Sequence, residues 1–273
     1  MNEILSIFSL CLGALIGSFL NVVIWRIPRG ESIVMPPSHC PKCNAPIKWH
    51  QNIPVFSWLM LRGKCANCRE PISRRYPAIE AITAVLFLAA FCRYGFFAPI
   101  AWIWLSLMVV GSCIDFDLKL LPDFVTVGGM ILGVVSSLTI FALSRFYAFE
   151  VAGPVPFVPP LYSILGLVAG FGFLWLIRFF GSLAFKREAM GLGDVFLMGA
   201  IGAICGPVAV LFTTIVSSVA GSIVGIAMLV VSKTKIGECI EIPYGPYLCV
   251  GCLLWMLRGP EIVDSYMKLL SGT

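Results

Sequence analysis

Long apolar runs dominate this sequence and leave few ways for the chain to fold. The first run, residues 4–25, is long enough to cross a bilayer, which takes about 20 residues. Only 12% of the 273 residues are charged and the mean hydropathy is +0.95, whereas soluble domains carry roughly 25% charged residues. Because backbone polar groups find no water inside a bilayer, apolar runs of this kind cross it as helices. The sequence therefore predicts an all-α polytopic membrane protein and excludes an ordinary soluble enzyme.

The lengths of the other apolar runs predict the number of crossings. The run 195–231 has 37 residues and would extend roughly 55 Å as one helix, nearly twice the ~30 Å hydrocarbon core. Gly206-Pro207 is the natural place for a break, so this run counts as two segments. We expect about eight transmembrane helices, in the ranges 4–25, 78–97, 99–114, 124–146, 162–180, 195–205, 207–231 and 245–257.

Residues 26–77 form the only long polar segment, and it contains two Cys-x-x-Cys pairs separated by 21 residues: Cys40, Cys43, Cys65 and Cys68. This spacing is typical of a zinc ion held by four thiolates, which leave no open coordination position, so we expect a structural zinc. Two disulfides are the alternative, and the reducing cytoplasm disfavours them. The expected organisation is a first transmembrane helix (1–25), a cytoplasmic zinc domain (26–77) and a transmembrane domain (78–273).

The positions of the basic residues predict the orientation. Nine of the nineteen Lys and Arg residues lie in the polar segment, and alternation of eight crossings leaves only four on the opposite side. The remaining six fall on the side of the polar segment: Lys119, Arg178, Lys186, Arg187, Lys233 and Lys235. Since cytoplasmic loops collect Lys and Arg, we expect this side to be cytoplasmic and both termini to lie outside.

Two aspartates stand where apolar runs meet the expected cytoplasmic face. Asp115 closes the run 99–114, and Asp194, in Gly191-Leu192-Gly193-Asp194, opens the run 195–205. A carboxylate entering an apolar segment is expensive and is a functional candidate by default. The alternatives are a helix N-cap for Asp194 and Asp123, and a solvated turn for Asp117.

If Asp115 and Asp194 meet, they cannot both ionise easily. One would then act as a base toward water, and the other, protonated, would polarise a scissile carbonyl, as in aspartic proteases. For Asn21, near the end of the first run, an interhelical hydrogen bond is favoured over a catalytic role.

Several motifs recur together along nearly the whole chain. They are Gly17-Ser18-Phe19-Leu20-Asn21 with the residues up to Pro28, the two cysteine pairs, Ser73-x-Arg75-Tyr76-Pro77-x-x-Glu80, Ile114-Asp115 with Leu121-Pro122-Asp123, Gly191-x-Gly193-Asp194, and Pro243-Tyr244-Gly245-Pro246. Together they resemble the type IV prepilin peptidase family, the bifunctional leader peptidases and N-methyltransferases of bacterial pilus and type II secretion systems. The motif Gly191-x-Gly193-Asp194, taken alone, is shared with presenilin-like proteases. The stretch 145–160 is longer than is usual for the family.

The resemblance implies an aspartic endopeptidase of the bacterial inner membrane with Asp115 and Asp194 as catalytic residues. It would cut the basic leader of a prepilin or pseudopilin after a glycine, on the cytoplasmic side of the client's hydrophobic helix. It would then methylate the new N-terminus, usually Phe, from S-adenosylmethionine. The resemblance also implies zinc on the four cysteines, whereas Arg75 and Glu80 are only weak candidates for binding the methyl donor.

We expect the bilayer and the prepilin as partners and no nucleic acid. A membrane transporter with intramembrane carboxylates and a zinc regulatory domain is the alternative function.

Overall fold

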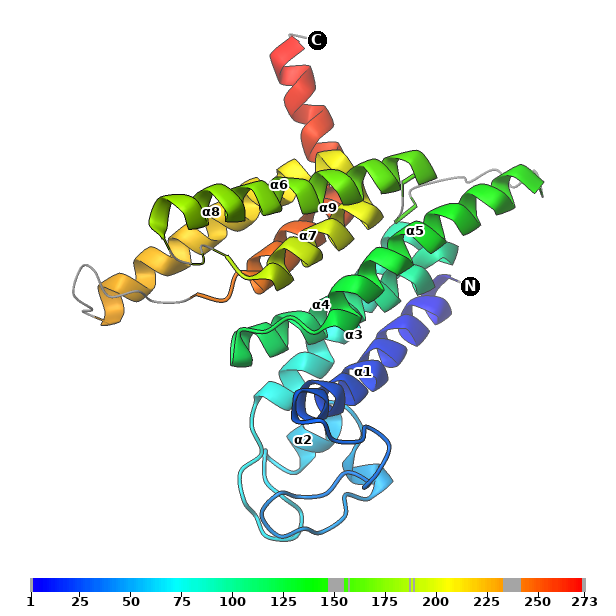
Figure 1. Ribbon diagram of the computed structural model, residues 1–273. Coiled ribbons are helices and arrows are strands. Elements are labelled where there is room, and N and C mark those ends of the chain that lie inside the picture. The colour runs from blue at the N-terminus through cyan, green and yellow to red at the C-terminus, as the bar shows by residue number, and fades with distance from the viewer. Residues whose placement is uncertain are drawn as a thin grey trace. The chain divides into compact units, whose positions relative to one another are not determined.

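The protein is mostly helical in the parts that the computed structural model describes, which are residues 2–146, 155–156, 158–186, 188, 190–232 and 242–271, and turns and loops make up much of residues 30–74 (Figure 1). No named β-strand occurs in these ranges. The helices are α1 (Asn2–Arg26), α2 (Phe56–Met60), α3 (Arg75–Tyr94), α4 (Ala98–Leu118), α5 (Asp123–Phe146), α6 (Pro160–Phe185), α7 (Leu192–Cys205), α8 (Pro207–Ser232) and α9 (Gly245–Ser271).

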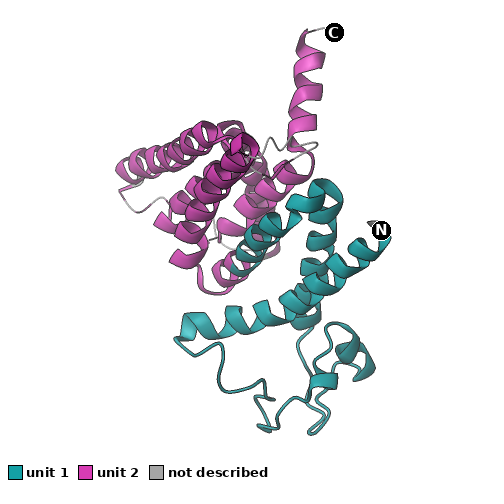
Figure 2. Ribbon diagram, turned by 90° about the vertical axis from the view of Figure 1, so that its right-hand side faces the viewer, with its two compact units in different colours: residues 1–110 teal, residues 111–273 magenta. Residues whose placement is uncertain are grey.

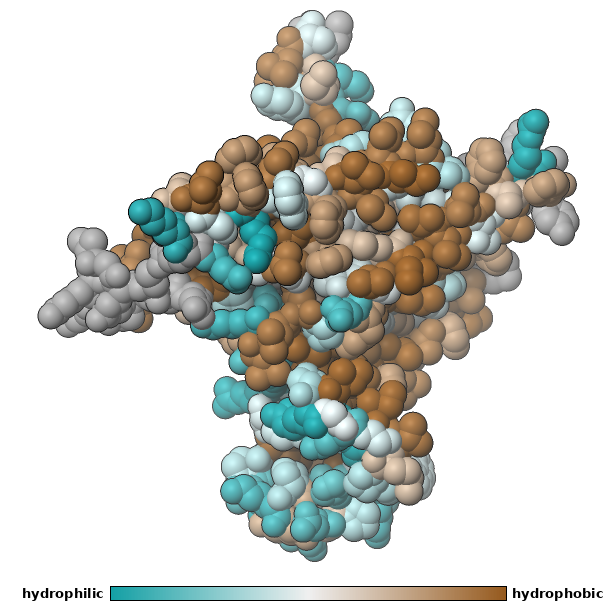
Figure 3. All heavy atoms as spheres, viewed as in Figure 1, coloured by the Kyte–Doolittle hydropathy of each residue, from teal (hydrophilic) through white to brown (hydrophobic). Residues whose placement is uncertain are grey.

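The length and apolar character of these helices make the chain a multi-pass membrane protein. Five segments are long and apolar enough to cross a bilayer, and one of them, Arg75–Leu118, contains both α3 and α4. The shorter α7 is apolar as well. Apolar side chains cover much of the visible helical surface (Figure 3), as expected where helices face lipid. Apart from the short α2, eight α-helices lie in the described residues, so the all-α polytopic prediction is confirmed.

The chain divides into two compact units, residues Met1–Val110 and Gly111–Thr273 (Figure 2). The boundary falls within α4. The first unit therefore contains the polar segment with α1 and α3, and the second contains α5 to α9 with the end of α4.

In the first unit, α1 and α3 approach closely through small residues. A Cβ atom added to Gly13 would lie 2.8 Å from the Cα of Ala84, which leaves no room for a side chain. Asn21 adds a polar link, because its Nδ2 donates to the carbonyl oxygen of Tyr76 on α3 at 3.2 Å. The interhelical role expected of Asn21 is confirmed.

In the second unit, α7 is the central helix. Every residue from Leu197 to Cys205 is buried. Glycines on the neighbouring helices let them approach its backbone: a Cβ added to Gly166 of α6 would overlap the carbonyl oxygen of Gly202, and one added to Gly133 of α5 would lie 2.8 Å from the carbonyl carbon of Ala203. Such close contacts between small residues are typical of helix packing in membranes.

The break expected in the run 195–231 is confirmed. The helix α7 ends at Cys205, α8 begins at Pro207, and Gly206 between them has a φ of +85°, which glycine adopts without strain. The end expected for the last helix is wrong, because α9 continues through Pro260 to Ser271. Charged residues beyond residue 257 end the apolar run but do not end the helix.

Parts of two expectations lie outside the described residues. They concern most of the stretch 145–160, and the positions of Arg187, Lys233 and Lys235 on which the orientation partly depends.

Candidate active site and cysteine cluster

Asp115 and Asp194 belong to different helices of the second unit. Asp115 lies in the last turn of α4 and is only 5% exposed. Asp194 lies in the first turn of α7 and is partly buried. The N-cap position of α7 is Gly191, and Asp194 follows it by three residues, so the interpretation of Asp194 as an N-cap is wrong.

The carboxylate of Asp115 is held by the first residue of α9. The backbone N–H of Gly245 donates to its Oδ2 at 3.0 Å, a hydrogen bond between residues 130 positions apart. A Cβ on residue 245 would lie 2.7 Å from the same oxygen, so only glycine lets the backbone come this close. The positive end of the α9 dipole also favours a carboxylate at this place.

Leu121 joins the three segments that surround the aspartates. A Cβ added to Gly193, next to Asp194, would lie 2.8 Å from the Cβ of Leu121. A Cβ added to Gly245 would lie 3.3 Å from the Cδ1 of the same leucine. The end of α4, the start of α7 and the start of α9 therefore meet at this leucine. The structure thus brings the two aspartates to one place in the second unit.

The other two aspartates of this region lie in different surroundings. Asp117 follows Asp115 by two residues and is exposed in the last turn of α4. Asp123 is the first residue of α5 and does not precede the helix as an N-cap would. Its negative charge is still stabilised by the positive end of the α5 dipole.

Sequence reasoning missed the support behind Gly245. The hydroxyl group of Tyr244 lies 2.8 Å from the Oγ of Ser217 on α8, and Ser217 is fully buried. This hydrogen bond links the residue preceding Gly245 to α8. The motif Pro243-Tyr244-Gly245-Pro246 was a visible signal, but nothing in the sequence showed that it meets Asp115.

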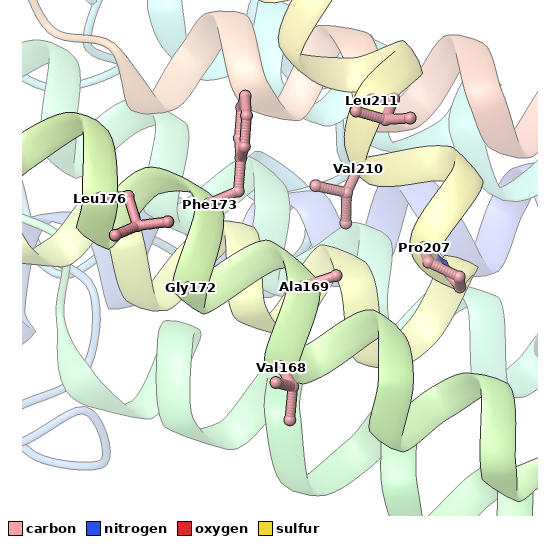
Figure 4. Close-up of a pocket in the computed structure, with 8 residues that line it drawn as sticks. All are labelled: Val168, Ala169, Gly172, Phe173, Leu176, Pro207, Val210 and Leu211. Atoms are coloured by element: carbon pink, nitrogen blue, oxygen red, sulfur yellow. The ribbon is translucent and has the colours of Figure 1, made fainter.

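A groove elsewhere in the second unit has a different character. It has a volume of about 420 Å³ and lies between α6 and α8, with the side chains of Phe173 and Val210 among its lining (Figure 4). Its lining residues are all apolar or glycine, so they supply no group for acid–base chemistry. The candidate active site is therefore the aspartate pair.

The four cysteines of the polar segment form a cluster in the first unit. The Sγ atoms of Cys40, Cys43, Cys65 and Cys68 all lie within 4.8 Å of one another, so the cluster could hold a metal ion. All four cysteines are free, and the 3.9 Å between the Sγ atoms of Cys40 and Cys68 is far longer than an S–S bond of about 2.05 Å. The disulfide alternative therefore finds no support.

The two halves of the cluster have the same local backbone. The N–H of Cys40 donates to the oxygen of Ala45, and the N–H of Cys65 donates to the oxygen of Glu70 in the corresponding position. The residues four positions after these cysteines, Asn44 and Arg69, have left-handed φ values of 55° and 62°. Each pair thus forms a tight turn that directs two thiols to one point.

The surroundings of Cys43 and Cys65 favour the thiolate form that binds metals, whereas desolvation and hydrogen bonds with the neighbouring thiols raise the pKa of Cys68 to about 12. The backbone N–H of Ala45 and the side chain of Asn67 lower the pKa of Cys43 to about 6. Backbone N–H groups of Cys68 and Asn67 lower the pKa of Cys65. The donor set and its hydrogen bonds therefore suit a thiophilic divalent ion such as zinc.

Glu80 and Arg75, the weak candidates for the methyl-donor site, have different surroundings. Glu80 is 8% exposed, and its Oε2 accepts the backbone N–H of Val55 at 2.7 Å. Val55 precedes α2 and has a left-handed φ of 60°, so this bond fixes an unusual turn of the polar segment against α3. Arg75 is exposed, and its backbone N–H donates to the Oγ of Ser73. The observed contact of Glu80 is structural.

Comparisons with known proteins divide the chain at nearly the same place as the two units. The family model described as "Bacterial Peptidase A24 N-terminal domain" matches residues 11–94, and the model described as "Type IV leader peptidase family" matches residues 102–226. The chain belongs to the type IV leader peptidase family. The second match contains both Asp115 and Asp194, and the first contains the four cysteines.

Curated relatives of this leader peptidase chain extend the likeness over most of its length. Proteins from Xanthomonas campestris and Pseudomonas putida, both named "Prepilin leader peptidase/N-methyltransferase", are 35% and 33% identical over 94% and 95% of this chain, and the matches cover 92% of each relative. A protein of the same name from Myxococcus xanthus is 36% identical over 84% of this chain, which spans 64% of that relative's length. No solved structure matches the chain.

Proposed function

We propose that this protein cleaves the leader peptides of prepilins and type II secretion pseudopilins and then N-methylates the new N-terminus, usually of Phe. The observation that carries the proposal is the meeting of Asp115 and Asp194 in one site, with the Asp115 carboxylate held by the N–H of Gly245. The names of the relatives supply the substrate class and the second activity. They give no support to the transporter alternative.

In the proposed mechanism the two carboxyl groups share one proton over the scissile peptide bond. The ionised group takes a proton from water, and the protonated group donates a hydrogen bond to the carbonyl oxygen. The fixed position of the Asp115 carboxylate reduces the reorganisation needed when water attacks. Cleavage would follow a glycine of the client, at the cytoplasmic edge of the bacterial inner membrane.

A structural zinc on Cys40, Cys43, Cys65 and Cys68 is part of the proposal. When bound, the ion would join the two turns of the polar segment and stabilise this segment, which has little hydrophobic core of its own. We propose that residues 26–77 form this cytoplasmic zinc domain, that residues 1–25 are the first transmembrane helix, and that residues 78–273 form the peptidase domain. The methyl donor would be S-adenosylmethionine.

The experiment that tests the proposal combines both reactions. The purified protein, reconstituted in lipid vesicles, is incubated with a purified prepilin and S-adenosylmethionine carrying an isotopically labelled methyl group. Mass spectrometry should show loss of the leader after glycine and one labelled methyl group on the new first residue. An intact prepilin would refute the peptidase assignment, whereas a cleaved but unmethylated product would refute only the methyltransferase assignment.

A further inference from the structure

The last three turns of α9, residues 261–271, differ from the rest of this helix in the way their side chains are distributed. At 100° per residue, six apolar side chains fall within an arc of about 160° of the helix circumference. They are Ile262, Val263, Tyr266, Met267, Leu269 and Leu270. The polar residues occupy the remaining arc, and they are Glu261, Asp264, Ser265, Lys268 and Ser271. The segment is therefore amphipathic, with a complete separation of its two faces.

The apolar face of this segment is open. Five of its six side chains are exposed, including Tyr266 at 60%, Leu270 at 63% and Leu269 at 80%. The segment extends beyond the other helices of the second unit (Figure 1). Among these side chains only Val263 is half-buried, where it lines a pocket with Gly206 and Pro207, so the exposed remainder of the face needs an environment that removes it from water.

The composition of the segment limits what that environment is. Three charged residues within three turns make the hydrocarbon core unfavourable, since each charge there is expensive. The exposed apolar face makes bulk water equally unsuitable. An amphipathic helix of this kind is stable in the boundary layer of a bilayer, with its apolar face toward the acyl chains. The protein's own membrane is next to the segment, because α9 begins beside Asp115 and leads away from it through the bundle.

A hinge for such a placement lies directly before the segment. Gly259-Pro260 separates it from the packed part of α9, and proline removes one hydrogen bond of the helix. A bend at Gly259-Pro260 would let the segment leave the axis of α9 and lie parallel to the membrane surface.

We propose that residues 261–271 bend at Gly259-Pro260 and lie flat in the interfacial layer of the leaflet opposite the aspartate pair, with a lipid surface as the partner of their apolar face. The polar face carries two acidic residues and one basic residue, so the attraction does not depend on anionic lipids. The inference concerns the membrane contact alone and does not depend on the peptidase activity.

The test places an environment-sensitive fluorescent amino acid at Tyr266, on the apolar face, or at Ser265, on the polar face. Genetic incorporation is needed because the chain has 11 cysteines, which preclude specific thiol labelling. The full-length protein is reconstituted in phosphatidylcholine vesicles that contain phospholipids with a nitroxide near the headgroup or at the end of the acyl chain. Water-soluble iodide reports exposure to solvent.

We expect the probe at position 266 to be quenched several-fold more by the shallow nitroxide than by the deep one, and the probe at position 265 to be quenched mainly by iodide. The same result is expected when phosphatidylglycerol is added. Stronger quenching by the deep nitroxide would show that the segment crosses the core, and iodide quenching at both positions would show that it projects into water. Protection of position 266 from both quenchers would show a protein partner. Each of these three results would overturn the proposal.

A second pair of variants separates the membrane contact from general folding. Leu270→Glu places a charge on the apolar face, whereas Ser271→Glu places the same charge on the polar face. With the probe at position 266, the first variant should lose most of the shallow quenching and the second should retain it. Equal quenching in the two variants would contradict the assignment of the faces.

Discussion

Replacing Gly245 with alanine adds one methyl group beside the Asp115 carboxylate. The new Cβ would lie 2.7 Å from Oδ2 and 3.2 Å from Cγ, whereas ordinary contacts begin at 3.4 Å. Either the carboxylate or the start of α9 must therefore move by about 0.7 Å. A misplacement of about 1 Å near reacting groups costs on the order of 100-fold in rate, so we expect Gly245→Ala to lower kcat by about 10- to 100-fold.

The assay is the cleavage rate of a purified prepilin by reconstituted protein, with KM and kcat determined separately. Because the methyl group acts on the catalytic geometry, kcat should fall while KM changes little. Gly128→Ala in α5 is the matched control, since a Cβ there meets nothing within 4 Å, and it should cleave at the normal rate. A Gly245→Ala protein that cleaves as fast as the unchanged protein would refute the contact between α9 and Asp115.

Three further predictions concern the polar segment and the packing of α6 on α7. Glu80→Ala leaves the N–H of Val55 without its acceptor, which costs about 1–3 kcal/mol of local stability, so hydrogen exchange at Val55 should accelerate. Glu80→Gln should largely restore the protection. Lost methylation with unchanged exchange would instead favour a role of Glu80 in binding the methyl donor. The purified protein should contain about one zinc per chain, and Cys65→Ser should lower this content and increase proteolysis of the polar segment. Purified protein without metal would contradict the zinc assignment. Gly166→Ala should destabilise the packing of α6 on α7 by about 1–3 kcal/mol, measured by thermal unfolding in detergent, whereas Gly172→Ala has open space and should be neutral.

The sequence predicted the helices well where apolar length decided the outcome. The break between α7 and α8 followed from the physical limit on the length of a crossing and from Gly206-Pro207. The last helix was predicted too short because hydropathy measures preference for lipid and does not measure whether a helix continues. Residues 258–271 keep the periodicity of an amphipathic helix, which an apolar run cannot reveal.

The site was predictable in its residue types and less so in its geometry. The cost of a carboxylate next to an apolar run made Asp115 and Asp194 the candidates, and the spacing of the cysteine pairs predicted the cluster that could hold a metal ion. The hydrogen bond from Gly245 joins residues 130 positions apart, and the one between the hydroxyl groups of Ser217 and Tyr244 depends on how α8 is placed. Both depend on tertiary packing, which sequence periodicity does not encode.

The central claim is that Asp115 and Asp194 act as one unit. The most direct test measures prepilin cleavage by Asp115→Asn, by Asp194→Asn and by the double variant, with Asp117→Asn as the matched control of the same chemistry on α4. We expect each single variant to lose about 10⁴-fold or more in kcat, the double variant to be no slower than the worse single variant, and Asp117→Asn to cleave normally. Substantial cleavage by either single variant, or losses that multiply in the double variant, would contradict a shared catalytic pair.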